Sequence, residues 1–129
     1  MSNSLNRTIL MIDDNHTVQE NVHDILKFEG HHVLRAHNGE TGLTIARAHY
    51  IDLVLCDIMM PGINGYEVLR QLRTYPPLKR VPFVIISSKS TQEDIEYGLE
   101  LGVDAYVPKP FTADELLSAV NQALARAER

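Results

Sequence analysis

The chain of 129 residues has one cysteine, Cys56, no tryptophan, and only 6% aromatic residues. A single cysteine cannot form an intramolecular disulfide, which excludes a small disulfide-stabilised secreted domain and fits the cytoplasm. No apolar run approaches the roughly 20 residues that a membrane helix needs, and the amino-terminal residues form no long apolar signal region. The sequence therefore predicts a cytoplasmic protein without membrane insertion.

Basic residues are in the minority, because 12 Lys and Arg stand against 17 Asp and Glu and give a net charge of −5. An acidic domain of this size is a poor nucleic-acid binder by itself, so direct nucleic-acid binding is not expected. The apolar fraction of 44% is sufficient for a hydrophobic core. The length fits one domain, 1–129, with a core over about residues 7–125.

Short apolar runs rich in branched residues alternate with stretches of helical spacing. The runs predict buried strands at about 7–12, 32–36, 52–56, 81–86 and 103–107. The spacing predicts helices at about 16–28, 38–49, 64–75, 92–101 and 112–124. Five strands and five helices in alternation favour an α/β fold with a parallel sheet covered on both faces.

Local signals mark several of the helix ends. Asn64 with Glu67, and Thr112 with Glu115, have the spacing of a capping box at the start of a helix. The helix at 92–101 contains Gly98, and an interior glycine costs about 1 kcal/mol relative to alanine. We therefore expect this helix to be the least stable of the five.

Charged residues lie just after three of the predicted strands. Asp13 and Asp14 follow the first, Asp57 follows the third, and Lys109 follows the last. Ligands of open parallel sheets bind outside the carboxyl ends of the strands, so these side chains are expected to gather at one edge. Three carboxylates close together repel one another unless a cation joins them. The sequence thus predicts a site for a divalent metal and a phosphoryl group.

Four motifs at strand ends are similar to those of receiver domains of bacterial two-component response regulators. They are Ile12-Asp13-Asp14-Asn15, the segment from Cys56 to Gly65, Ile86-Ser87-Ser88, and the segment from Tyr106 to Phe111. The resemblance covers about residues 8–124. It implies a doubly wound, flavodoxin-like sheet with strand order 2-1-3-4-5.

The resemblance implies that Asp57 accepts a phosphoryl group, for which a carboxylate is a competent nucleophile. Asp14 and Asp57 are expected to bind Mg²⁺ directly, together with the backbone carbonyl of Met59, and Asp13 to act through a bound water. The simpler interpretation is that Asp14 and Asn15 cap the first helix, and the two interpretations are compatible.

The resemblance also assigns roles to three residues on the last two strands. The Lys109 ammonium is expected to contact a phosphoryl oxygen, and its bond to Pro110 to be cis. Ser87, where the family more often has Thr, is expected to move toward the phosphoryl group. Tyr106 is expected to follow it inward, although a static, half-buried tyrosine is the competing interpretation.

Other residues near the site are less determined. Met59 and Lys89 are expected to border the phosphoryl group, where such positions tune the lifetime of the phosphate, and Lys89 is a candidate contact for it. Pro108 departs mildly from the family pattern because it stiffens the strand end. The six histidines have no convincing metal-ligand spacing.

These residues predict a phosphorylation-controlled switch that catalyses only its own modification and is not an enzyme in the usual sense. The partner is expected to be a histidine kinase or a histidine phosphotransfer protein that presents phosphohistidine. The added charge would then change the face formed by 92–101, 103–107 and 112–124, which would bind a target or form a dimer. The chain resembles single-domain regulators, and a receiver from a longer protein is equally compatible.

Three other functions fit the sequence less well. Aspartyl-phosphate phosphatases and mutases place the nucleophile in an Asp-x-Asp motif after the first strand, a spacing that Asp13-Asp14-Asn15 lacks. A flavin binder would need a hydroxyl- or glycine-rich phosphate loop there, and two carboxylates would repel a phosphate. The third is a degenerate receiver that binds partners without phosphorylation, against which the complete set of charged residues argues.

Overall fold

The computed structural model describes residues 6–127. The expected core of about residues 7–125 lies within this range. The outermost residues of the predicted domain, 1–5 and 128–129, lie outside the described residues.

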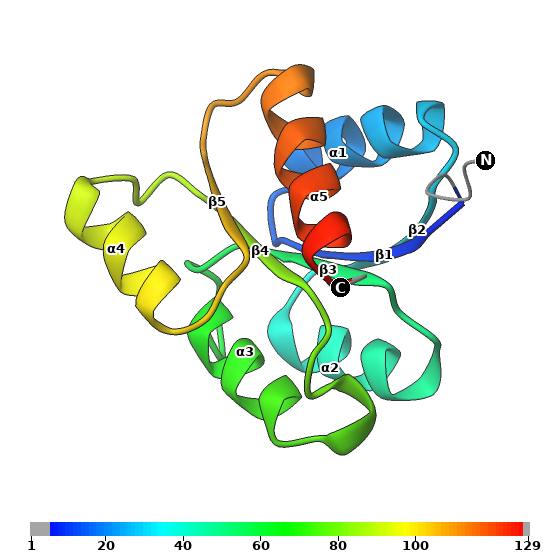
Figure 1. Ribbon diagram of the computed structural model, residues 1–129, viewed down its shortest axis with the longest axis vertical. Coiled ribbons are helices and arrows are strands. Elements are labelled where there is room, and N and C mark those ends of the chain that lie inside the picture. Colours follow the sequence, from blue (N-terminus) through cyan, green and yellow to red (C-terminus); the bar gives the residue numbers. More distant parts are fainter. Residues whose placement is uncertain (1–5, 128–129) are drawn as a thin grey trace.

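Five parallel strands form one sheet in the order β2-β1-β3-β4-β5 (Figure 1), which confirms the predicted fold class and strand order. The strands are β1 (Thr8–Ile12), β2 (His32–Ala36), β3 (Leu53–Cys56), β4 (Phe83–Ser87) and β5 (Ala105–Pro108). The order reverses between β1 and β3, and a crevice opens at such a point outside the carboxyl ends of the strands. The register pairs Ile12 with Cys56, so the residues that follow these two strands emerge side by side.

The helices are α1 (His16–Phe28), α2 (Gly39–Ala48), α3 (Gly65–Arg73), α4 (Gln92–Glu100) and α5 (Ala113–Ala127), with a 3₁₀ turn η1 at Pro76–Leu78. In Figure 1, α1 and α5 cover one face of the sheet, α2 and α3 cover the other, and α4 lies beside β5. The central strands β3 and β4, covered on both faces, are buried throughout, as their continuous apolar runs predict.

Successive residues of each strand serve the two halves of the core. Ile9 and Met11 pack in the cluster under α1 and α5. Leu10 and Ile12 pack in the cluster under α2 and α3. This alternation fixes the register of β1, because a shift by one residue would exchange the two sets.

Two strands begin later than predicted, β4 at Phe83 and β5 at Ala105. The Asp104 carboxylate accepts a hydrogen bond of 2.8 Å from the backbone N–H of Phe83. The backbone N–H of Val81 instead closes a turn onto the carbonyl of Leu78. These backbone N–H groups form hydrogen bonds to a side chain and within a turn. They are therefore not available for the hydrogen bonds between strands that the apolar pattern predicted.

The capping boxes agree with the sequence only in part. At α5 the Thr112 hydroxyl and the Glu115 carboxylate each accept the other's backbone N–H, as predicted. At α3 the Asn64 side chain accepts from Glu67, but the Glu67 carboxylate pairs with Arg70 and Gln71 instead of closing the box. A hydrogen bond between charged groups is stronger than one to a neutral amide, so the reciprocal part of the prediction was wrong. An additional box, Thr91 with Asp94, starts α4.

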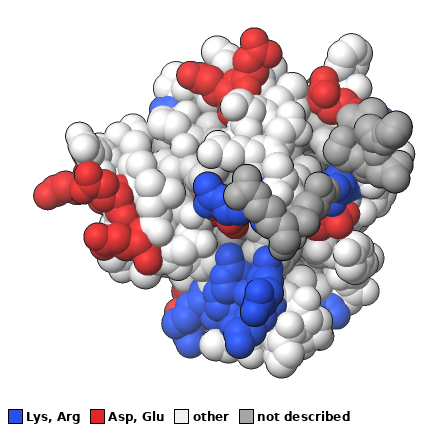
Figure 2. Space-filling model, in the orientation of Figure 1, with Lys and Arg blue, Asp and Glu red and all other residues white. Residues whose placement is uncertain are grey.

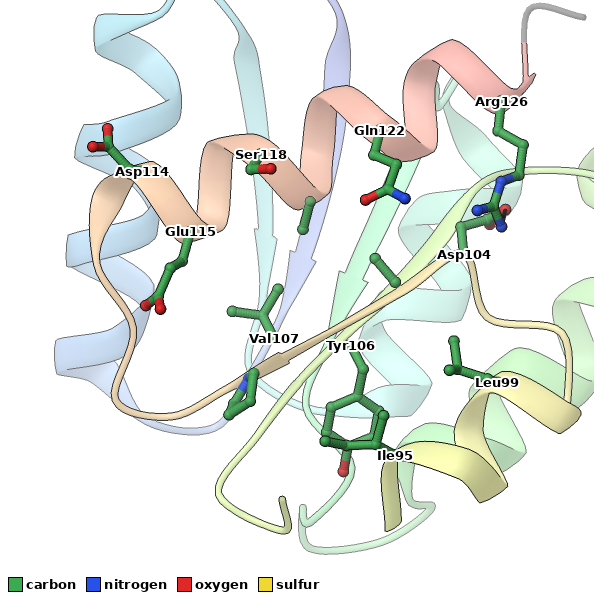
Figure 3. A pocket seen from close by; sticks show the side chains of 13 residues that line it. Ile95, Leu99, Asp104, Tyr106, Val107, Asp114, Glu115, Ser118, Gln122 and Arg126 are labelled. Atoms are coloured by element: carbon green, nitrogen blue, oxygen red, sulfur yellow. Dashed lines mark ion pairs between the residues drawn. The ribbon is translucent and has the colours of Figure 1, made fainter. Parts of the chain in front are cut away.

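Figure 2 shows that acidic and basic side chains occupy different parts of the surface. Acidic side chains lie over α4 and over the amino-terminal end of α5. Basic side chains gather near η1, where Lys79 and Arg80 are exposed. Between α4 and α5, across β5, runs a groove of about 650 Å³ (Figure 3). Within residues 6–127 no helix has the length and apolar content that crossing a membrane requires.

Candidate functional site

The carboxylates of Asp13, Asp14 and Asp57 lie together at the carboxyl ends of β1 and β3. One oxygen from each lies within 4.8 Å of the others. Asp13 is fully buried and Asp57 is 5% exposed, whereas Asp14 is exposed to solvent. Three carboxylate oxygens with one open side match the ligands of Mg²⁺, which takes a few protein oxygens and keeps several waters. The donor set therefore fits a divalent cation.

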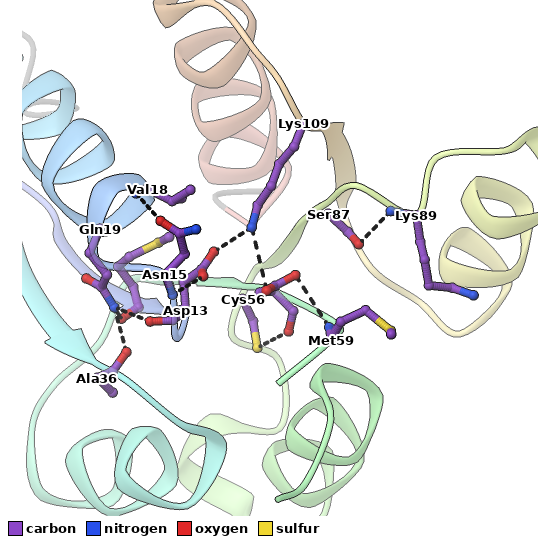
Figure 4. A network of polar contacts seen from close by, with 12 residues as sticks. Asp13, Asn15, Val18, Gln19, Ala36, Cys56, Met59, Ser87, Lys89 and Lys109 are labelled. Carbon is purple, nitrogen blue, oxygen red and sulfur yellow. Dashed lines mark hydrogen bonds and ion pairs between the residues drawn. The ribbon is translucent and has the colours of Figure 1, made fainter. Parts of the chain in front are cut away.

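Lys109 reaches this cluster from the loop after β5 (Figure 4). Its Nζ lies 2.9 Å from Asp13 Oδ2 and 3.5 Å from Asp57 Oδ2. The peptide bond between Lys109 and Pro110 is cis, as the resemblance implied. A single ammonium is thus shared by two buried carboxylates, so the cluster keeps an excess of negative charge.

The buried and negatively charged surroundings affect the pKa of Asp57. Burial, and then the neighbouring Asp13 carboxylate, raise the pKa of Asp57, while Lys109 opposes the shift. Burial likewise raises the pKa of the Cys56 thiol well above its usual range. Cys56 is therefore a neutral, buried side chain beside the site, as the sequence suggested.

Asn15, which lies between the acidic cluster and α1, caps this helix. Its side chain accepts a 2.9 Å hydrogen bond from the backbone N–H of Val18 and so caps α1. Its own backbone N–H donates to Asp13 Oδ1 at 2.9 Å. The helix cap is thus supplied by Asn15, and the same residue orients the Asp13 carboxylate.

Gln19 is a residue of this site that the sequence reasoning missed. It is fully buried, and its Nε2 donates to the backbone carbonyls of Asp13 at 2.9 Å and Ala36 at 2.6 Å. Its Oε1 accepts from Arg35 Nε at 3.3 Å. Gln19 precedes Val22 and Leu26 by three and seven positions, which is core spacing, and a polar residue at a core position was the available signal.

Replacing Gln19 with leucine, which has a similar shape, is expected to lower the free energy of unfolding by about 1–3 kcal/mol, because the carbonyls of Asp13 and Ala36 each lose one hydrogen-bond donor. The Asp13 backbone would also lose an anchor, so Mg²⁺ affinity should fall as well. Chemical denaturation and calorimetric Mg²⁺ titration would measure the two effects. Lys27→Leu, at an exposed position of the same helix, is the control. An unchanged unfolding midpoint in Gln19→Leu would contradict the expectation.

Ser87 lies buried at the end of β4, and its Oγ accepts a 3.0 Å hydrogen bond from the backbone N–H of Lys89. The Lys89 ammonium lies 3.4 Å from Asp94 Oδ1, and in Figure 4 it points away from the acidic cluster. Asp94, in the first turn of α4, therefore pairs with the Lys89 side chain, which the sequence analysis named as a candidate phosphoryl contact. Met59 is 60% exposed beside Asp57, and its backbone N–H lies 3.4 Å from Asp57 Oδ1.

Tyr106 is half-buried between β5 and α4, and its hydroxyl donates to the backbone carbonyl of Lys89. Burial raises the pKa of Tyr106 to about 12. A Cβ on Gly98 would lie 3.1 Å from Tyr106 Cδ2 and 3.3 Å from Cε2. The glycine in α4 thus has a packing reason, because it leaves room for the ring.

Gly98→Ala is expected to stabilise the protein by less than the ~1 kcal/mol that alanine gains over glycine in a helix. The added methyl group would press on the Tyr106 ring and cancel part of the gain. In a Tyr106→Ala background the full gain should return, since the obstructing ring is gone. Urea unfolding of the four proteins in this double-mutant cycle measures the coupling. Equal gains in both backgrounds would show that the ring and position 98 do not interact.

The fold and the cluster define a class of protein: a doubly wound domain with three carboxylates and a lysine at the carboxyl ends of its strands. Comparison with known proteins agrees, because the model of the response regulator receiver domain matches residues 9–121. The chain belongs to this family.

Individual relatives support the assignment. Protein PilH of Pseudomonas aeruginosa is 37% identical over 91% of this chain and 97% of its own length. A response regulator receiver domain protein from Clostridium thermocellum is 30% identical, with a TM-score of 0.85 over 95% of this chain and 97% of that one. The chain spans about half the length of the transcriptional regulators that it also matches.

A third comparison concerns the metal. The receiver domain of a sensor histidine kinase from Pseudomonas aeruginosa PAO1 is 27% identical, with a TM-score of 0.85 over 93% of this chain and 98% of that one. That structure holds a magnesium ion in its active site cleft. The acidic triad of Asp13, Asp14 and Asp57 is thus typical of a Mg²⁺-binding receiver site. As a receiver domain, the chain is a phosphoacceptor regulatory module rather than an enzyme in the usual sense, which the sequence predicted.

Proposed function

We propose that Asp57 takes a phosphoryl group from a phosphohistidine of a histidine kinase or phosphotransfer protein, with Mg²⁺ held by Asp14, Asp57, the Met59 carbonyl and, through water, Asp13. The observation that carries this proposal is the cluster of three carboxylates with the shared Lys109 ammonium. We propose one receiver domain for the whole chain, because both core clusters draw on strands across the sheet. We propose the cytoplasm as the compartment, because a single cysteine, Cys56, fits a reducing environment.

The residues of the site have separate tasks in the transfer. An Asp57 carboxylate oxygen attacks phosphorus, a new oxygen–phosphorus bond forms, and the nitrogen–phosphorus bond to the partner's imidazole breaks. The bound cation would neutralise charge on the transferring group. Lys109 already lies 3.5 Å from Asp57 Oδ2, so it needs little movement to contact a phosphoryl oxygen.

The same contacts suggest how the signal leaves the site. The Ser87 hydroxyl accepts from the Lys89 backbone, so its own proton is available for a phosphoryl oxygen. The Lys89 carbonyl in turn accepts from the Tyr106 hydroxyl. A movement of Ser87 toward the phosphoryl group would displace the Lys89 backbone and release Tyr106, which lines the face formed by α4, β5 and α5.

A second groove, of about 690 Å³, gives a partner access to Lys109. It lies between α1 and the loop after β5, and its walls include Val18, Asn21, Pro110 and Phe111. An apolar groove beside the site suits the docking of a phosphodonor. We propose it as the place where the phosphohistidine protein binds.

Intact mass after incubation with acetyl phosphate and Mg²⁺ tests the proposal. One added phosphoryl group is expected on the wild type, and none on Asp57→Asn or without Mg²⁺. If no adduct forms on a folded protein with Mg²⁺ bound, a purified histidine phosphotransfer protein carrying labelled phosphate is the second donor. Failure with both donors would overturn the proposal and leave a phosphate-independent binding module.

A further inference from the structure

The groove between α4 and α5 has an apolar floor. Ile95 and Leu99 form its α4 wall, Tyr106 and Val107 of β5 its floor, and Ala119 part of its α5 wall (Figure 3). Ile95 and Leu99 are one helical turn apart, and Leu99 is 49% exposed. Gly98 is the one buried residue of α4, so most of this helix is accessible to a partner.

Acidic side chains flank this floor on both helices. Glu96 and Glu100 are exposed and follow Ile95 and Leu99 by one position, so they lie on the flank of α4 that turns away from Gly98. Asp114 and Glu115 are exposed and line the groove where α5 begins. Figure 2 shows these two acidic regions with largely uncharged surface between them and one small basic spot.

The one basic residue lining the groove, within the described part of the chain, is already matched. Arg126 Nη1 lies 3.9 Å from Asp104 Oδ1, and Asp104 lines the groove as well. Lys89, at the start of α4, pairs with Asp94. The groove therefore presents an apolar stripe between uncompensated carboxylates.

We infer that the target of this face is a cationic amphipathic segment of another protein, with apolar side chains on the floor and Lys or Arg opposite Glu96, Glu100, Asp114 and Glu115. The inference rests on the proposed function, which makes this face the output of the switch, and adds the chemistry of the partner. Complementary charge contributes specificity and speed of association, and the apolar stripe contributes buried area. A helix laid along a groove is one of the recurring modes of peptide recognition.

The same charges argue against the alternative occupant, a second copy of the chain. A symmetric dimer through this face would bring the same patch of both subunits together. Glu96 and Glu100 would then approach the carboxylates of the other copy, and like charges across an interface disfavour that pairing. The acidic flanks thus select a basic partner over self-association.

Three labelled helical peptides test the inference. They share one leucine face and carry lysine, glutamine or glutamate at all other positions. Fluorescence anisotropy with Mg²⁺ present is expected to give the tightest binding for the lysine peptide, about tenfold or more over the glutamate peptide, with a difference that shrinks as salt rises. Amide chemical shifts should move in α4, β5 and α5.

Charge reversal supplies the matched control. Glu96→Lys/Glu100→Lys is expected to remove or invert the order of the three peptides. Glu29→Lys/Glu40→Lys changes the net charge equally outside the groove, at the half-buried Glu29 and the exposed Glu40, and should leave the order intact. An unchanged order in the groove variant, shifts confined to the cluster around Asp57, or a dimer that forms through the α4–β5–α5 face would each overturn the inference.

A second measurement distinguishes a failure of the partner chemistry from a failure of the proposed function. Intact mass of the same samples after acetyl phosphate reports phosphorylation of Asp57 without reference to any peptide. A phosphorylated protein without charge preference overturns the partner chemistry alone. A protein that never accepts a phosphoryl group overturns the switch, whatever the peptides do.

Discussion

Lys109→Met should lower the free energy of unfolding by about 3 kcal/mol in the absence of Mg²⁺. The variant keeps much of the side-chain volume and removes the ammonium that lies 2.9 Å from Asp13 and 3.5 Å from Asp57. Asp13 is fully buried and Asp57 nearly so. Two ionised carboxylates would then face each other without their cation, and removing one partner of a buried pair commonly costs 3–5 kcal/mol.

Mg²⁺ distinguishes this electrostatic explanation from a packing defect. A divalent cation at the same carboxylates would replace the missing charge, so saturating Mg²⁺ should recover a large part of the lost stability. Urea unfolding with and without Mg²⁺ measures the recovery. Lys79→Met, at an exposed position before β4 and therefore near the amino ends of the strands, should change stability by less than about 0.5 kcal/mol. A deficit in Lys109→Met that Mg²⁺ leaves untouched would point to packing instead.

The sequence specified the architecture well because strong local signals agreed with one another. Continuous apolar runs such as Leu53–Cys56 mark strands buried on both faces, and α1 begins and ends as the helical spacing indicates. The strand order could not be predicted in this way, because hydrophobic period and composition say nothing about which strands are neighbours. It came from the resemblance of the four motifs, and the sheet confirms it.

The details that the sequence missed depend on competition between side chains distant in the chain or on the same helix. Glu67 could close a capping box or pair with Arg70, and only the folded geometry shows that Arg70 wins. The pairing of Lys89 with Asp94 is another contact of this kind, and a contact of Lys89 with a bound phosphoryl group stays a prediction. Gln19 reaches the carbonyl of Ala36 in β2, a contact that no local pattern describes.

Asp57→Asn should act in the opposite direction to Lys109→Met. It removes the proposed phosphoryl acceptor, so no phosphorylation is expected, and it should raise the free energy of unfolding by about 1 kcal/mol at neutral pH without Mg²⁺. Burial, and then Asp13, raise the pKa of Asp57 despite the nearby Lys109, so its ionised form is disfavoured in the folded protein. An amide of nearly the same shape carries no charge to be disfavoured.

The pH dependence identifies the cause. Because the folded-state pKa of Asp57 lies above its ordinary value of 3.8, the folded protein binds more protons than the unfolded chain between the two values, and stability falls there as pH rises. The penalty is complete above the folded-state pKa and vanishes below the ordinary value. The advantage of Asp57→Asn should therefore be largest near neutral pH and shrink toward acid, as unfolding curves across that range would record.

Mg²⁺ should invert the ranking of the two proteins. A ligand that binds only the folded state adds about 2.7 kcal/mol at a concentration of 100 times its Kd. The wild type offers three carboxylates to the cation, whereas Asp57→Asn offers two and an amide oxygen, so the wild type should gain more. With Mg²⁺ the wild type is then the more stable protein, and without it the variant is. A variant that remained more stable at saturating Mg²⁺ would mean that Asp57 is no ligand, since the repulsion that destabilises the metal-free site is the same charge that binds the metal.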